Sequence, residues 1–363
     1  MSKIVYLLGA GASFGRRGPT DETIEYSYYD PVSGSDPILK VSKSVSIIEG
    51  LPVVSELPGR MEYMLGLIYK LVAESIPNPF FSDYITLARQ LKWLQQESAR
   101  HATVDTFAKK LWLTGQDHSY LQLKRILSAY LMLEQMLNKP DKRYDAFFAS
   151  ILGNDAKDLP SNVRILSWNY DYQLELAFSE YLRSSSISDI EEHLFLDHKN
   201  YGIHGARKSD SFRVIKLNGS ALLYNSKTKN IVNPFMNQGY QNVSLCSSKP
   251  QIAVSKVSDI IKDEQNDCAL SFAWEALDPK FLDCVIKSIQ DADTLVIIGY
   301  SFPFFNRSVD KILFDSMKDL KRIYIQDIDP DTIEQSVSNL LTERHITIEK
   351  KYKTQQFFLP PEL

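Results

Sequence analysis

Small and polar residues follow several short apolar runs of the sequence, and their types point to nucleotide chemistry. The groups are Gly9-Ala10-Gly11-Ala12-Ser13, Asn169-Tyr170-Asp171, Asn218-Gly219-Ser220, Gly299-Tyr300-Ser301, and Asp327 with Asp329. Glycines let the backbone approach a ligand closely, and free N–H groups in such a turn attract phosphate oxygens. The first turn therefore has the features of a diphosphate-binding site.

Each group also has a plainer interpretation. The first turn departs from the dinucleotide fingerprint, because Phe14 stands in place of the third glycine and Gly15 comes one residue late. It could therefore be a tight strand-to-loop turn. Asn169 could form an Asx turn, and Asp327 and Asp329 could cap a helix that begins at the following proline.

The elements that must position these groups are short apolar strands alternating with helices. Runs of β-forming residues predict strands at 3–8, 163–168, 212–217, 294–298, 322–326 and 345–348. Apolar spacings of three and four predict helices at 84–94, 104–113, 121–137, 172–182, 270–289, 308–317 and 330–341. Alternation of this kind predicts an α/β fold with a Rossmann-like, doubly wound, mainly parallel sheet. Ligands bind such sheets at the carboxyl ends of the strands.

A helical subdomain is expected inside this α/β fold. Residues 1–57 would begin the nucleotide-binding domain and carry a loop insertion, since 16–50 is polar, turn-rich and expected to be mobile. Residues 58–139 would form the helical insertion, and 140–363 the remainder of the domain. The polar stretch 220–267 gives no clear prediction.

Composition excludes several classes of protein. The 363 residues are 44% hydrophobic and 24% charged with net charge -4, which is typical of a globular chain and argues against disorder. The weak net charge and the absence of a basic run argue against direct nucleic-acid binding. The 3 cysteines form no Cys-x-x-Cys pair, so neither a disulfide framework nor a cysteine metal site is expected. No long apolar run or leader pattern occurs, so we expect a cytoplasmic protein without membrane contact.

Four of the strand-end groups resemble the sirtuin-like NAD-binding superfamily, in particular its divergent bacterial branch associated with antiphage defence. The matching segments are 9–13 (GAGAS), 167–171 (SWNYD), 216–220 (KLNGS) and 298–302 (IGYSF). Each motif is short, but all four occur in the order of that family and at predicted strand ends.

The resemblance implies roles for individual residues around NAD. It implies that the first turn holds the diphosphate and that the other cofactor contacts come from later strand ends; the cofactor-binding residues are Gly9, Ala10, Gly11, Ser13, Gly219, Gly299, Ser301 and Asp327. It further implies that Asn169 and Asp171 line the nicotinamide-ribose pocket. No metal site is expected, because neither the cysteines nor the histidines have metal-like spacing.

Two departures from the family bear on the reaction. The chain lacks the four-cysteine zinc module and the cofactor loop of sirtuin deacylases, so protein deacylation is not expected. Asn218 stands where the family has its catalytic histidine, and an amide cannot act as a general base. His204 offers a second imidazole, although a surface-loop histidine is the plainer interpretation.

The resemblance implies an NAD+ glycohydrolase with Asn169, Asp171, Asn218 and His204 at the reacting bond and with NAD as substrate. Such an enzyme would act in bacterial antiphage defence by depleting NAD. The alternative is an inactive or weakly active NAD- or ADP-ribose-binding scaffold subunit of a defence complex. Control is expected from homo-oligomerisation or from a partner protein, either a DNA-translocase-type ATPase or an Argonaute-like protein.

Overall fold

The protein consists of two compact units, each assembled from separate stretches of the chain. The computed structural model describes residues 2–18, 22–30, 35–44, 46–74, 81–184, 186–199, 211–228, 230–232, 234–235, 249–341 and 345–363. The first unit takes in Met1–Ser13, Pro140–Ser220 and Ala269–Leu363. The second takes in Phe14–Lys139 and Ala221–Cys268. Every strand-end group named above belongs to the first unit.

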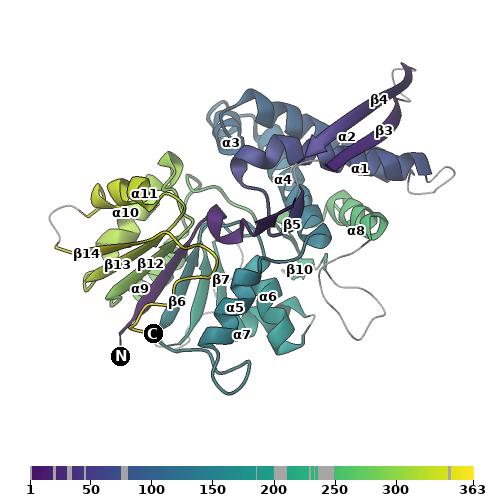
Figure 1. Ribbon diagram of the computed structural model, residues 1–363. Helices are drawn as coiled ribbons and strands as arrows, with labels where there is room; N and C mark the ends of the chain where they lie inside the picture. Colours follow the sequence, from purple (N-terminus) through teal and green to yellow (C-terminus); the bar gives the residue numbers. More distant parts are fainter. Residues whose placement is uncertain are drawn as a thin grey trace. The chain divides into compact units, whose positions relative to one another are not determined.

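The first unit is built on a parallel sheet of seven strands. The strands are β1 (Ile4–Leu8), β6 (Val163–Ser167), β7 (Leu196–His198), β8 (Arg213–Lys216), β12 (Thr294–Ile298), β13 (Arg322–Gln326) and β14 (Thr347–Lys351). They lie in the order β14-β13-β12-β1-β6-β8-β7, and each neighbouring pair is parallel (Figure 1). The predicted Rossmann-like, doubly wound α/β fold is therefore confirmed.

Helices cover both faces of this sheet. They are α5 (Lys142–Ile151), α6 (Gln173–Leu182), α7 (Ile187–Leu194), α9 (Pro279–Ile289), α10 (Arg307–Ser316) and α11 (Pro330–Ser338). Alternate residues of β1 point to opposite faces, as the strand period requires. Val5 and Leu7 join a buried cluster with side chains of α9, α10 and α11. On the other face the Tyr6 ring meets Phe147 of α5 with 5.1 Å between ring centroids.

The second unit is mainly helical. Its helices are α1 (Leu57–Glu74), α2 (Phe81–Arg100), α3 (Val104–Leu113), α4 (Asp117–Leu137) and α8 (Pro250–Lys262). Its strands are β2 (Arg16–Arg17), β3 (Glu22–Asp30), β4 (Ser35–Ser44), β5 (Ile47–Glu49), β9 (Leu223–Asn225), β10 (Ile231–Val232) and β11 (Asn266–Cys268). A buried ion pair of 3.0 Å between Arg60 and Glu134 links α1 to α4.

Two predictions about local structure are wrong. The stretch 16–50 was expected to be a surface loop, yet β3 and β4 pair as antiparallel strands. Polar residues interleave with the β-forming Tyr, Ile and Thr residues of this stretch, which disguises the strand pattern. The helix expected from residue 270 begins instead at Pro279. The Asp278 side chain caps it by accepting a hydrogen bond from the Lys280 N–H at 2.7 Å, and proline is favoured at the first position of a helix.

Candidate functional site

The carboxyl ends of four neighbouring strands carry most of the predicted site residues. The sheet places β12, β1, β6 and β8 side by side and parallel. The strand order reverses between β1 and β12, because the sheet grows from β1 through β6 on one side and through β12 on the other. Ligands of open α/β sheets bind in the crevice at such a reversal. The candidate site lies at this edge.

The glycines after β1 pack directly against the turn after β12. The N–H of Gly9 donates to the Ile298 carbonyl at 3.0 Å, and that of Gly11 donates to the Gly299 carbonyl at 2.9 Å. A Cβ atom on Gly11 would lie 2.7 Å from the Gly299 Cα, and Gly299 itself has a φ of 59°. Glycine is therefore required by the contact between the two turns. These two N–H groups are engaged there, so the turn differs from the diphosphate cradle that the sequence predicts.

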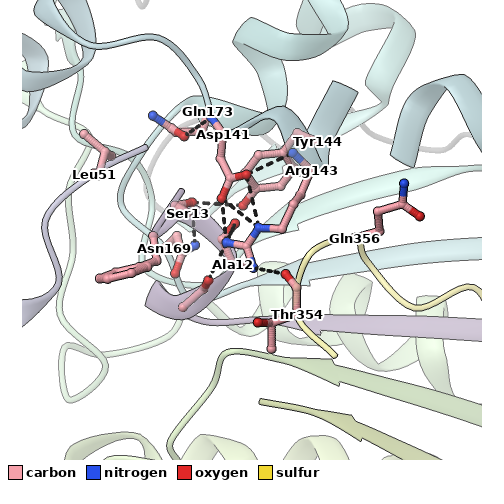
Figure 2. A network of polar contacts seen from close by, with 12 residues as sticks. Ala12, Ser13, Leu51, Asp141, Arg143, Tyr144, Asn169, Gln173, Thr354 and Gln356 are labelled. Carbon is pink, nitrogen blue, oxygen red and sulfur yellow. Dashed lines mark hydrogen bonds and ion pairs between the residues drawn. The ribbon is translucent and has the colours of Figure 1, made fainter. Parts of the chain in front are cut away.

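Ser13 and Asn169 meet at the ends of β1 and β6 (Figure 2). The Asn169 amide donates from Nδ2 to Ser13 Oγ at 3.1 Å, and Ser13 Oγ shares a second hydrogen bond of 2.9 Å with the Tyr144 hydroxyl. Burial raises the pKa of Tyr144 well above its usual range, and the negative charge of Asp171 raises it further. The hydroxyl therefore keeps its proton, and the Asn169 amide is held by a fully buried chain of hydrogen bonds.

Arg143 fastens the first turn to the start of α5. Its guanidinium donates to the carbonyl oxygens of Gly11 at 2.8 Å and of Ala12 at 3.3 Å, and to Thr354 at 3.2 Å (Figure 2). Asp141, the N-cap of α5, accepts from Arg143 Nε at 2.9 Å and pairs with its charge. A charged fork of this kind binds several acceptors in one fixed geometry. The turn that carries Ser13 is thereby fixed from the side of α5.

Lys216 connects β8 to the loop after β6. Its Nζ donates to the backbone carbonyl of Asp171 and lies 3.2 Å from a carboxylate oxygen of Glu175, which is fully buried. Burial raises the pKa of Glu175, and the charge of Lys216 lowers it in part. The Asp171 carboxylate accepts from the Gln173 N–H at 3.1 Å, at the start of α6. Asp171 is therefore held both by its backbone and by its side chain.

Asn218 brings an unsatisfied acceptor to the end of β8. Its Nδ2 donates to the Trp168 carbonyl at 3.3 Å, which joins the loops after β6 and β8. Its side chain is only 5% exposed, and its Oδ1 has no hydrogen-bond partner among the described residues. The hydroxyl of Ser220, two residues further on, is also buried without a partner in that part of the chain. Buried polar atoms of this kind usually receive a hydrogen bond, so they indicate where a ligand or water would bind.

The other predicted residues lie around this centre or outside it. Gly219 has a φ of 65°, so a glycine is needed for the backbone turn. Ser301 is exposed at the end of β12. Asp329 is the N-cap of α11, and Asp327, after β13, accepts from the Asp329 N–H at 3.0 Å. The helix-capping interpretation is therefore confirmed for Asp329. His204 lies outside the described residues.

Tyr144 and Arg143 are the contributors that sequence analysis did not identify. They come from α5, a helix that the apolar pattern did not predict, and Tyr144 lies 131 residues from its partner Ser13. A buried hydroxyl at a strand end requires a hydrogen-bond partner. The sequence contains many hydroxyl groups, however, and no pattern in it selects this one.

The assembled site is made mostly of neutral amides and hydroxyls, with the Asp171 carboxylate among them. Such groups can orient ribose hydroxyls, and a carboxylate can stabilise positive charge that develops on a sugar.

Within the described ranges no three or more His, Cys, Asp or Glu side chains gather in a way that could hold a metal ion. In that same part of the chain, no helix combines the length and the apolar character needed to cross a membrane. No family model matches this chain, and no curated protein sequence matches it.

Proposed function

We propose that this protein is an NAD+ glycohydrolase. Water would replace nicotinamide at the anomeric carbon of the ribose, giving nicotinamide, ADP-ribose and a proton. The observation that carries the proposal is the 3.1 Å hydrogen bond between Ser13 and Asn169, which joins the ends of β1 and β6 beside the reversal of strand order, with Asn218 bonded to the same loop. These three residues come from three distant motifs that resemble one family of NAD-binding proteins.

The chemistry of the nicotinamide-ribose bond suits a site of this composition. The bond breaks dissociatively and leaves a cationic sugar, so the barrier depends on the orientation of the ribose and on stabilisation of positive charge. In the proposed complex Asn169 orients the reacting ribose or the attacking water. Asp171 supplies negative charge near the sugar. The fixed amide and the anchored loop mean that little reorganisation would accompany the reaction.

Asn218 would bind rather than titrate. Its buried Oδ1 needs a donor, and a ribose hydroxyl is a donor of suitable size. An amide takes no proton. The replacement of the expected histidine by Asn218 therefore removes general-base assistance, which costs about 100- to 10,000-fold in rate. We therefore expect slow turnover in the isolated protein.

The decisive measurement is release of nicotinamide from NAD+ by the purified chain. Wild type should release it, and Asn169→Ala should lower kcat/KM by about 100-fold or more, because the amide that orients the sugar is lost. Asn154→Ala is the matched control, since Asn154 is exposed and belongs to the loop after α5. Unchanged turnover in Asn169→Ala would remove Asn169 from the site.

A second candidate function is a scaffold that binds NAD or ADP-ribose without cleaving it. One observation favours it: Asn218 stands where the resemblance implies the catalytic histidine, and an amide cannot act as a general base. Saturable binding of NAD+ by calorimetry, with no nicotinamide released, would favour the scaffold. Release of nicotinamide that falls in Asn169→Ala would favour the enzyme.

The biological role that we propose is depletion of NAD in the bacterial cytoplasm during antiphage defence. It depends on the family resemblance, and it requires control by self-assembly or by a partner such as a translocating ATPase or an Argonaute-like protein. Inducing the chain in bacteria while measuring cellular NAD tests the role. A fall in NAD that the Asn169→Ala variant does not produce is the expected result.

A further inference from the structure

Asp310 is a buried carboxyl group beneath the loops that follow β6 and β12. It belongs to α10 and is only 1% exposed. The Tyr300 hydroxyl donates to its Oδ2 at 2.8 Å, and the Trp168 indole donates from Nε1 to its Oδ1 at 3.2 Å. The Tyr300 hydroxyl in turn accepts from Asn306 Nδ2 at 3.0 Å. One carboxyl group therefore holds an aromatic side chain from each loop.

These two aromatic side chains are adjacent to the residues of the proposed NAD site. Their rings stack with 6.0 Å between centroids and 16° between planes. Trp168 precedes Asn169, and its carbonyl accepts the hydrogen bond from the Asn218 amide at 3.3 Å. Tyr300 follows Gly299, whose carbonyl binds the first turn. A shift of the stacked pair would move both amides relative to each other.

The surroundings of Asp310 make its charge costly. Its two hydrogen-bond donors, Tyr300 and Trp168, are neutral. Asp310 lines a cavity of about 190 Å³ together with Arg307, which is also on α10. The residues that line this cavity on the side of α11 carry no charge. Burial raises the pKa of Asp310 to about 7, and the hydrogen bonds from Tyr300 and Trp168 lower it in part. The group therefore changes its protonation state close to neutral pH.

We propose that Asp310 is a positioning residue: its carboxylate aligns Trp168 and Tyr300, and through them the Asn169 and Asn218 amides of the NAD site. This inference rests on the proposed function. The ionised group accepts from both aromatic donors. When protonated, the carboxyl group accepts from Trp168 but donates to the Tyr300 hydroxyl oxygen, so the hydrogen of that hydroxyl must turn away and loses its acceptor.

The stability of the fold and the alignment of Trp168 and Tyr300 respond to pH in opposite directions. The folded-state pKa lies above that of an unfolded aspartate, so the stability contributed by Asp310 is complete below about pH 4 and is lost as the pH rises through about 7. Alignment requires the ionised form and is complete only above pH 7. The loops are therefore held best under conditions in which the buried charge destabilises the fold.

The test compares the pH profile of wild type with that of Asp310→Asn. In wild type, kcat/KM for NAD+ should fall about tenfold from pH 8 to pH 6, in step with the ionised fraction. Asp310→Asn should fold, since its amide can accept from the Trp168 indole and donate to the Tyr300 hydroxyl oxygen. Its kcat/KM should be lower than that of wild type and should vary less than about twofold over that range. Asp315→Asn, an exposed change on the same helix, should keep the wild-type profile. An Asp310→Asn profile that still falls tenfold would overturn the inference.

Fluorescence separates this inference from the proposed function, because it requires no NAD. A variant that retains Trp168 as its one tryptophan (Trp93→Phe, Trp112→Phe, Trp274→Phe) should show an emission change centred near pH 7, and the added Asp310→Asn should abolish it. A flat titration alongside measurable NAD turnover would overturn the role of Asp310 alone. Failure of wild type to bind or cleave NAD+ at any pH would overturn the proposed function.

Discussion

Asn169 and Asn218 occupy equivalent places on neighbouring strands but are bound very differently. Each lies two residues beyond the end of its strand, β6 or β8, and their side chains are 6% and 5% exposed. The Asn169 amide is tied to Ser13 and through it to Tyr144. The side-chain oxygen of Asn218, Oδ1, has no partner among the residues that the structure describes.

We call Asn169 with its partners Ser13 and Tyr144 the fixed side of the site, and Asn218 with its unpartnered Oδ1 the receptive side. A buried acceptor without a partner costs about 1–3 kcal/mol, which a bound donor can recover. The Asn169 side is bonded by the protein itself, so it is ready to orient a ligand without reorganising. The Asn218 side gains most from a ligand. Two amides that the sequence presents alike would therefore have different parts in the proposed binding of NAD.

The largest expected effect is a gain of turnover in Asn218→His. An imidazole there would restore a titratable base on the receptive side and raise the rate of nicotinamide release by about 100- to 10,000-fold. Asn169→His is the matched control, and it should lower turnover because it breaks the bond to Ser13. Nicotinamide release measured at pH 7.5 distinguishes them. Equal responses of the two variants would refute the comparison.

A smaller effect is expected on the stability of the ligand-free protein. Asn169→Ala removes an amide that is bonded on the fixed side, and it should lower the free energy of unfolding by about 1–2 kcal/mol. Asn218→Ala removes an unsatisfied acceptor along with one long bond, so its cost should be smaller by about 1 kcal/mol. Urea denaturation of both variants measures this. A greater loss in Asn218→Ala would show that Asn218 is held by the protein after all.

The smallest expected effect is that of Tyr144→Phe. It removes one buried hydroxyl from the chain that fixes Asn169 and should cost about 1 kcal/mol of stability. Tyr181→Phe is the control, since the Tyr181 hydroxyl bonds Asp145 at the surface and its loss should cost less than about 0.5 kcal/mol. The difference can be measured by thermal unfolding. If both cost the same, the buried chain of hydrogen bonds does not stabilise the fixed side.

The framework of the site was predictable from local sequence. Short apolar runs ending in Gly9, Asn169, Asn218 and Gly299 indicated strands, and parallel strands bring their carboxyl ends to one edge. The convergence of these groups follows from topology, and topology follows from the alternation of strands and helices. The roles of individual atoms did not follow. Gly11 is required by contact with Gly299, a packing relation that no local pattern contains.

Long-range partners account for most of what the sequence could not reveal. Arg143 and Tyr144 bind residues more than 130 positions away, so no spacing rule connects them. Asp310 reads in the sequence as an ordinary polar position of an amphipathic helix. Its two hydrogen-bond donors come from the loops after β6 and β12, which are distant in the sequence. Pairing of this kind depends on the completed fold.

The position of β1 in the middle of the sheet has a consequence for how the molecule matures. β1 is made before its neighbours, yet Ile4 pairs with Val163 on one side and with Thr294 on the other. Contacts so distant in the chain form slowly, and a strand awaiting its partner presents an open edge. On the ribosome, the turn that carries Ser13 stays without its opposing turn until β12 has emerged. A nascent chain that lacks β12 therefore has an incomplete site.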